Sequence, residues 1–192
     1  MERDKSLGER FGLGRFSTRE VVVMGLLVAM NIVLTRVASI RIAIGSVEGI
    51  RIGFGTLPVV FGSLSMGPLA GGLIGAVGDL IGYWVNPMGP YMPHFTITYT
   101  VGGVLPGLIF RSMPGKWRNT WTMGLSIGIP HVIMSCIVVP LLLEHLFSLP
   151  VAVTMPPRFI AAAFIIPSYT LICRALIART GSQGWFIRTL LP

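Results

Sequence analysis

Apolar residues dominate six runs of the chain, and these runs are separated by shorter stretches with charges, prolines and glycines. The runs cover residues 20–43, 52–66, 69–86, 95–111, 120–147 and 157–179. A helix needs about 20 residues to cross the hydrocarbon core of a bilayer. The pattern predicts an all-α membrane protein with six transmembrane helices, and the alternative is four full spans with shorter re-entrant pieces.

Prolines and glycines divide the apolar runs into helices. The second and third runs meet at Met66, Gly67 and Pro68. A glycine followed by a proline at a first helical position predicts a tight turn, so we count two helices there. The fifth run contains Pro130 and Pro140, which predict a kinked helix. Along the third run, glycines at 71, 75, 78 and 82 give a smooth face that favours close helix packing.

The composition agrees with this interpretation and excludes an ordinary soluble enzyme. Of the 192 residues, 53% are hydrophobic and 11% are charged, whereas soluble proteins average about 25% charged residues. The net charge of +8 comes without a nucleic-acid fold signature, so we expect no nucleic-acid partner. Cys136 and Cys173 lie in apolar runs without metal-binding spacing, and we interpret them as buried free thiols.

The positions of the basic residues predict the orientation in the membrane. With six spans and a cytoplasmic N-terminus, 11 of the 15 Lys and Arg residues lie on the cytoplasmic side. We therefore expect a polar cytoplasmic segment at residues 1–19, a membrane domain at 20–180 and a cytoplasmic tail at 181–192. The four remaining basic residues fall in the outer half: Arg36, Arg41, Arg51 and Arg158.

These four outer arginines are candidates for an anion-binding site. Helices could bring them together at an outward-facing cavity, and a guanidinium group binds carboxylate or phosphate through paired hydrogen bonds. Two alternatives remain. An arginine at a span end can reach the membrane interface, and Glu48, between Arg41 and Arg51, can neutralise part of the cluster.

Asp79 and the aromatic residues that follow it are a second set of candidates. Asp79 lies inside the third run, where a carboxylate needs a hydrogen-bonding partner or a wet cavity. Aromatic rings that suit a flat ligand occur at Tyr83, Trp84, Tyr91 and Phe95. Aromatic residues at this depth are also typical of a membrane-interface belt. His94 has no second histidine at ligand spacing, and we predict no metal site.

Catalysis has little support in the sequence. No nucleophile stands beside an obvious histidine base, and no glycine-rich nucleotide-binding loop ending in Gly-Lys-Ser or Gly-Lys-Thr is present. Energy for transport would therefore come from another protein. In the first run, Gly25 and Ala29 have the small-xxx-small spacing that lets another helix approach closely. This face can dock a partner or pack within the chain.

Five ordered blocks resemble a known family. They read LTRVASI at 34–40, RIGFGTLP at 51–58, MGPLAGG at 66–72, GDLIGY at 78–83 and PMGPYMPHFT at 87–96. Together they resemble the substrate-binding S components of energy-coupling factor (ECF) transporters, most of all the folate type. The resemblance spans residues 20–111, and in the last two spans it rests mainly on Pro157 and Arg158.

The resemblance implies a function and a set of partners. An S component binds a vitamin from outside the cell and associates with a transmembrane coupling protein and two cytoplasmic ATPases. ATP is used by those subunits, and this chain needs no cofactor. The implied location is the plasma membrane of a prokaryote, and Gly25 and Ala29 are implied to contact the coupling protein. In a folate-type member, arginines would hold the glutamate end and aromatic rings would stack on the pterin.

The residues implied to bind substrate are those in the matching motifs. They are Arg36, Arg51, Phe54, Asp79, Tyr83, Phe95 and Thr96, with Arg158 added from the sixth run. The family usually has Phe-Pro-Gly-Phe-Thr where this chain has Met92, Pro93, His94, Phe95 and Thr96. The differences at Met92 and His94 can change which ligand is bound. Three alternatives to a folate-binding subunit remain: an S component for another vitamin such as riboflavin, a small intramembrane enzyme acting on an anionic head group, and an assembly subunit without ligand.

Overall fold

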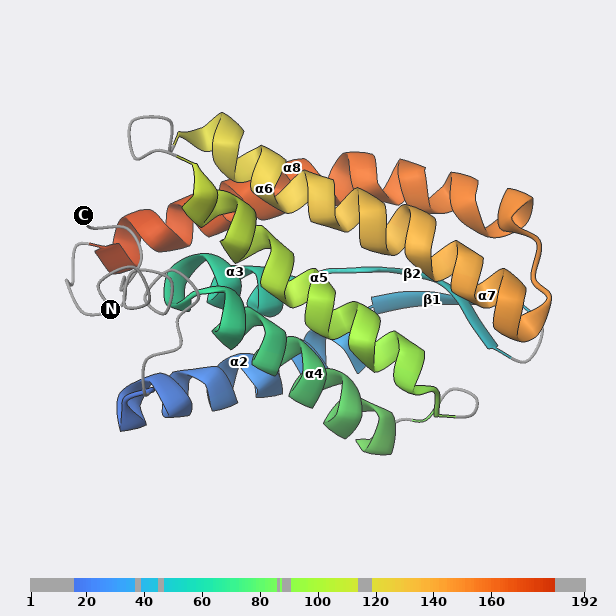
Figure 1. Ribbon diagram of the computed structural model, residues 1–192, viewed down its shortest axis with the longest axis horizontal. Coiled ribbons are helices and arrows are strands. Elements are labelled where there is room, and N and C mark those ends of the chain that lie inside the picture. Colours follow the sequence, from blue (N-terminus) through green and yellow to red (C-terminus); the bar gives the residue numbers. More distant parts are fainter. Residues whose placement is uncertain are drawn as a thin grey trace, which may run out of the picture.

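The fold is a bundle of helices with one short β-hairpin. The computed structural model describes residues 16–36, 39–44, 47–85, 87, 91–113 and 119–181, and at 36, 40–44, 47–52 and 180–181 it describes the backbone only. The elements are α2 (Thr18–Arg36), β1 (Ser39–Ile44), β2 (Val47–Gly53), α3 (Leu57–Met66), α4 (Pro68–Val85), α5 (Pro93–Ser112), α6 (Thr120–His131), η2 (Val132–Val138), α7 (Val139–Phe147) and α8 (Val151–Gly181). The segments α6, η2 and α7 form one continuous helix (Figure 1).

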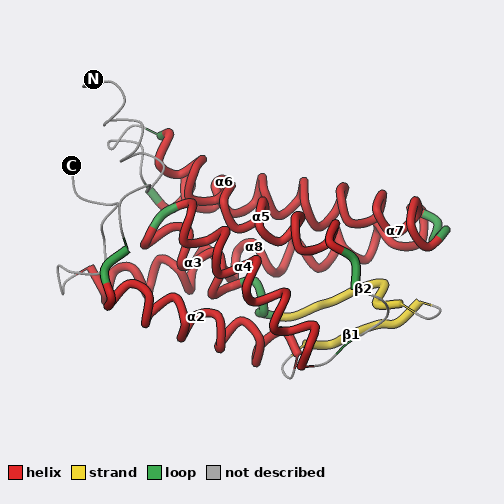
Figure 2. The backbone as a smooth tube through the Cα atoms, turned by 60° about the horizontal axis from the view of Figure 1, so that its bottom comes forward, coloured by secondary structure: helices red, strands yellow, loops and turns green. Residues whose placement is uncertain are grey.

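The prediction of six helices is confirmed within the described residues. Four of the helices there are long and apolar enough to cross a membrane: α2, α4, the continuous α6–α7 helix and α8. The ten-residue α3 is too short to cross alone, since a crossing takes about 20 residues. The start of α2 and the end of α8 lie at the same end of the molecule, and the hairpin lies toward the other end (Figures 1 and 2).

The predicted first span, 20–43, is wrong at its C-terminal end. The helix ends at Arg36, and residues 39–44 form β1, which pairs antiparallel with β2. In the sequence SIRIAI, β-branched residues alternate with other residue types, which favours a strand. The prediction of a longer helix rested on apolar content alone. The predicted second span, 52–66, is also too long, because residues 52 and 53 end β2 and α3 starts at Leu57.

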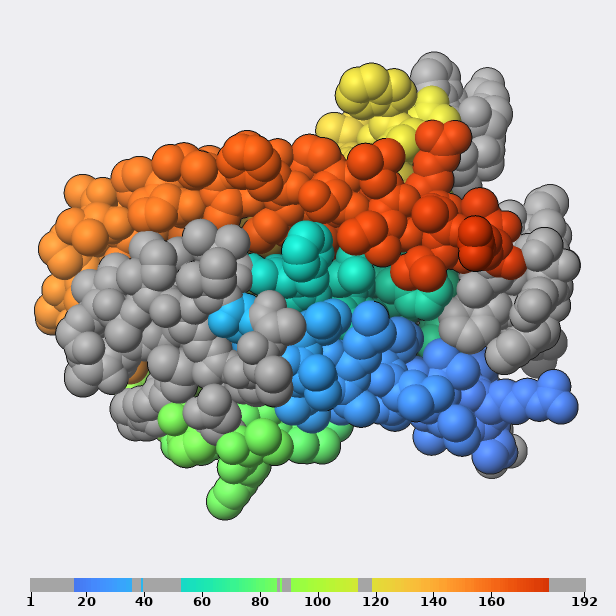
Figure 3. Space-filling view, turned by 180° about the vertical axis from the view of Figure 1, so that it is seen from behind, coloured from blue at the N-terminus to red at the C-terminus, as the bar shows by residue number. Residues whose placement is uncertain are grey.

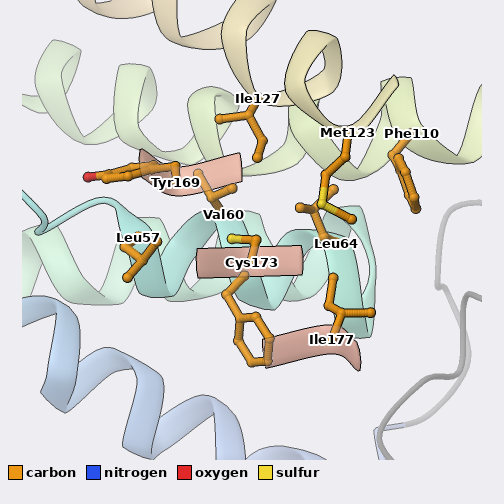
Figure 4. Close-up of a cluster of buried hydrophobic side chains, with 10 residues drawn as sticks. Leu57, Val60, Leu64, Phe110, Met123, Ile127, Tyr169, Cys173 and Ile177 are labelled. Atoms are coloured by element: carbon orange, nitrogen blue, oxygen red, sulfur yellow. The ribbon is translucent and has the colours of Figure 1, made fainter. Parts of the chain in front are cut away.

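Helix α3 lies at the centre of the bundle. All ten of its residues are buried, and it contacts α2, α4, α5 and α8. The hydrophobic core combines α3 with three later helices (Figure 4): Leu57, Val60, Phe61, Leu64, Phe110, Met123, Ile127, Tyr169, Cys173 and Ile177. From behind, α3 is visible between α2 and α8 (Figure 3). Cys136 and Cys173 are free and buried, as the sequence analysis predicts.

The predicted turn between the second and third spans is confirmed. Gly67 has a φ of +115°, a left-handed conformation that glycine adopts without strain, and Pro68 begins α4. A side chain at position 67 would also collide with the Arg111 guanidinium group. The turn therefore needs glycine for its conformation, whereas the flexible Arg111 side chain could move away from a larger residue.

The glycine face of α4 packs closely against α5, as predicted. A Cβ atom at Gly71 or Gly103 would lie within 3.0 Å of the carbonyl oxygen of the other residue. At Gly75, a Cβ atom would lie 2.7 Å from the Tyr99 carbonyl oxygen. The backbones of α4 and α5 therefore touch, and this contact fixes the relative positions of two helices that both line the cavity described below.

Candidate functional site

A cavity of about 220 Å³ lies inside the bundle. It is bordered by α2, α3, α4, α5, α6, η2, α7 and α8, and by the residues that precede α3 and α5. Its lining is mostly apolar and aromatic, and it contains a few polar groups. This combination is typical of small-molecule binding sites, where polar groups orient a ligand within an apolar pocket.

Asp79 on α4 lines the cavity and forms a hydrogen bond with the next helix. The Thr96 hydroxyl group on α5 donates to Asp79 Oδ2 at 2.7 Å. Thr96 Oγ1 also lies 3.1 Å from the Tyr91 hydroxyl oxygen. The Asp79 carboxylate thus has the polar partner that its position in an apolar helix requires. Because it accepts from Thr96 through one oxygen, it can still accept hydrogen bonds from a ligand.

Aromatic rings lie beside this polar group. The Tyr83 and Tyr91 rings have centroids 5.2 Å apart at an interplanar angle of 58°, and both residues line the cavity together with Phe95 and Tyr99. Trp84, another candidate, has a side chain that is 83% exposed, and it lies outside the cavity. Three of the four predicted aromatic residues therefore line the cavity, and the fourth, Trp84, lies on the outer surface; their role in ligand binding stays a prediction.

Two hydrogen bonds hold the segment between β2 and α3 beside the cavity. The Asn31 side-chain amide donates to the Gly55 carbonyl oxygen at 2.7 Å, and the Tyr169 hydroxyl group donates to the Gly53 carbonyl oxygen at 3.2 Å. Phe54 packs against the Tyr169 ring, with centroids 6.0 Å apart. The Phe54 side chain is 44% exposed and does not border the cavity, so a ligand-binding role for Phe54 stays a prediction.

Arg158 on α8 also borders the cavity. Its Nη1 atom donates to the Ser135 carbonyl oxygen on η2 at 3.3 Å, and both residues line the cavity. The cavity is therefore lined by a carboxylate group and by a guanidinium group, which carry opposite charges.

The other predicted arginines belong to the hairpin region. Arg36 ends α2, and the register of the hairpin pairs position 41 with position 51. The side chains of these arginines and of Glu48 lie outside the described residues. Their predicted role in anion binding stays a prediction.

Gly25 and Ala29 lie on an exposed face of α2. A Cβ atom placed at Gly25 would meet no atom within 4 Å. The small residues of α2 are therefore not used for packing within the described part of the chain.

Apart from Arg158, the cavity-lining residues of the later helices were not predicted from the sequence. His131, Met134, Ser135 and Tyr169 all line the cavity, and the His131 ring lies edge-on to Tyr169 with centroids 6.4 Å apart. The sequence did contain a signal for two of them, because the polar residues His131 and Ser135 lie between two prolines in an apolar run. Among the described residues, no group of three or more His, Cys, Asp or Glu side chains could hold a metal ion.

Comparison with known proteins gives matches to vitamin transporters. Residues 15–177 match a family model described as "ECF-type riboflavin transporter, S component". The folate transporter FolT of Clostridium novyi (strain NT) is 31% identical over 152 residues, which cover 79% of this chain and 84% of that protein.

Solved structures share the fold. The crystal structure of FolT bound with folic acid superposes with a TM-score of 0.66 at 23% identity, covering 82% of this chain and 91% of that one. The structure of the S component of a bacterial ECF transporter gives a TM-score of 0.63 at 21% identity, covering 84% and 97%.

Proposed function

Because this chain belongs to the family of ECF-type transporter S components, we propose that its cavity binds folate or a related pterin. An S component is a membrane transport subunit and not an enzyme, so the cavity is a binding site for a transported substrate. One observation carries the choice of folate: Asp79 and Arg158 border the same aromatic-lined cavity.

The chemistry of folate matches this arrangement. Its pterin ring carries N–H groups that can donate to the Asp79 carboxylate, and its flat surface can stack on aromatic rings such as Tyr83. Its glutamate end carries carboxylates that a guanidinium group binds through paired hydrogen bonds. The relative from Clostridium novyi, a folate transporter, supports the same ligand.

Riboflavin is the second candidate, because the matching family model is described by that vitamin. The isoalloxazine ring of riboflavin is neutral and does not need a cationic partner. The two ligands therefore differ in how strongly they depend on the arginines. If folate is the ligand, Arg51→Ala weakens its binding, whereas binding of a neutral vitamin survives the substitution.

Titration calorimetry on the detergent-purified protein tests the proposal. We expect saturable binding of folate near one per chain, with no binding of riboflavin or thiamine, and 5-formyltetrahydrofolate reports the tolerated oxidation state. Riboflavin binding without folate binding would contradict the proposal and favour the second candidate.

The proposal includes partners and orientation. The chain would join a transmembrane coupling protein and two cytoplasmic ATPases in the plasma membrane of a prokaryote, and those ATPases would use the ATP. The exposed small residues Gly25 and Ala29 support a docking face for the coupling protein. The basic residues support cytoplasmic termini, with residues 1–19 and 181–192 flanking the membrane domain.

A further inference from the structure

The helix that follows α6 changes its hydrogen-bonding pattern beside the cavity. Residues Val132–Val138 form a π-helix, in which each N–H group pairs with the carbonyl oxygen five residues earlier. At the end of this segment, the Val139 N–H group donates to the Met134 carbonyl oxygen. Such π-helical turns are frequent at functional sites.

Pro140 follows the last of these π-helical hydrogen bonds and cannot form the next one. The next donor would be the N–H group of residue 140, and it would pair with the carbonyl oxygen of Ser135. Proline has no N–H group. The Ser135 carbonyl oxygen therefore loses the backbone donor that the π-helical series would supply, and in an apolar environment such a group requires a replacement.

Arg158 supplies the replacement from the neighbouring helix. Its Nη1 atom donates to the Ser135 carbonyl oxygen at 3.3 Å. A guanidinium group has five N–H donors in a planar fork, so Arg158 can hold this carbonyl group and a ligand carboxylate at the same time. Both residues line the cavity, so the bond fixes the guanidinium group at its border.

We infer that Pro140 is a positioning residue for substrate binding. By removing the backbone N–H group at position 140, it keeps the Ser135 carbonyl oxygen available to hold Arg158 toward the anionic end of the ligand. This inference rests on the proposed function and deepens it. Pro140 itself is fully buried and does not line the cavity, so it acts through Arg158 and not by touching the ligand.

The test restores the missing N–H group. In Pro140→Ala, the new backbone N–H group can donate to the Ser135 carbonyl oxygen and displace Arg158. Removing a charge-assisted hydrogen bond in Arg158→Gln is expected to weaken folate binding about 10- to 100-fold, and Pro140→Ala about fivefold or more. In the Pro140→Ala/Arg158→Gln double variant, affinity should match that of Arg158→Gln within about twofold, because the two residues act through one contact.

Two controls separate positioning from general damage to the protein. Pro167→Ala makes the same substitution inside α8 at an exposed position that does not line the cavity, and it should leave folate affinity unchanged. The neutral pterin 6-hydroxymethylpterin, which lacks carboxylates, should bind Pro140→Ala as it binds the natural protein. If Pro140→Ala folds poorly, Pro140→Val restores the same N–H group with a volume closer to that of proline.

Three results would overturn the inference: unchanged folate affinity in Pro140→Ala, equal weakening of the neutral pterin, or a further loss in the double variant. If the natural protein binds no folate, the proposed function fails. A crystal structure of Pro140→Ala then decides the inference separately. A backbone N–H group at position 140 bonded to the Ser135 carbonyl oxygen, with Arg158 displaced, supports it, and an intact bond from Arg158 to Ser135 overturns it.

Discussion

At the scale of single residues, the site depends on side chains that are distant in sequence. Asp79 is 17 positions from its hydrogen-bonding partner Thr96, and it lies on the preceding helix. Its position in an apolar run predicted that it needs a partner, because an isolated carboxylate in hydrocarbon is costly. The identity of the partner depended on how α4 and α5 pack, which a single sequence does not show.

We expect Asp79→Asn to weaken folate binding by about 1.5–3 kcal/mol, since the substitution replaces a charged acceptor with a neutral amide. Titration calorimetry with the purified variant measures the change. Trp84→Ala, on the same helix but exposed outside the cavity, is the matched control and should bind folate as the natural protein does. Equal affinity in both variants would show that Asp79 does not contact the ligand.

At the scale of elements, close backbone contact holds α4 and α5 together, and both helices line the cavity. The glycine spacing in the sequence predicted such a face, and the structure identifies Gly103 on α5 as its counterpart to Gly71. The hairpin, by contrast, was not predicted from the sequence. Its strands are rich in Ile and Val, and apolar content did not distinguish them from the end of a helix.

Two adjacent glycines on α5 provide a direct test of this helix contact. A methyl group at Gly103 would collide with the backbone of Gly71, so we expect Gly103→Ala to lower the free energy of unfolding by about 1–3 kcal/mol. At Gly102 the nearest atom would be 3.7 Å away, so Gly102→Ala should be neutral or stabilise by up to about 1 kcal/mol. Thermal unfolding in detergent measures both. Equal unfolding temperatures would argue against close backbone contact at Gly103.

At the scale of the whole molecule, the chain is a membrane subunit whose α2 helix carries small residues on its exposed surface. Gly25 and Ala29 on α2 are exposed, whereas the glycines of α4 pack inside the bundle. Both sets have small-residue spacing in the sequence, so spacing alone could not separate packing within the chain from docking to a partner. The tertiary structure shows packing within the chain for the α4 glycines and leaves Gly25 and Ala29 exposed, where docking to a partner is our proposal.

Gly25→Leu should prevent co-purification with the coupling protein and ATPases while folate affinity and unfolding temperature stay unchanged. The reason is that a larger side chain at this position blocks a close helix approach, whereas a Cβ atom there meets no described atom of this chain within 4 Å. Gly25→Ala, which keeps the residue small, is the control and should retain assembly. Normal co-purification of Gly25→Leu would place the docking face elsewhere.

The orientation of the chain is testable by labelling with a membrane-impermeant maleimide. Ser17→Cys, just before α2, should react only in inverted vesicles, and Pro87→Cys, after α4, only in intact cells. The natural thiols Cys136 and Cys173 are buried and give a low background. Reversal of this labelling pattern would show that the termini face outward.

The sequence by itself determined the class of protein, the six helices and the tight turn at Gly67, and it singled out a segment, 79–96, of which five residues line the cavity. These features depend on local chemistry: apolar runs long enough for a membrane, turn residues, and polar side chains in apolar surroundings. Ordered motifs also indicated the family.

The tertiary structure decided where α2 ends, which aromatic rings reach the cavity, and how Arg158 meets Ser135 across 23 positions of sequence. It also showed a π-helical segment, Val132–Val138, just before Pro140, whereas the sequence predicted a kinked helix. The physical reason is the same in each case. These features depend on which backbone and side-chain groups become neighbours when the helices pack, and helix packing is not encoded in any single run of residues.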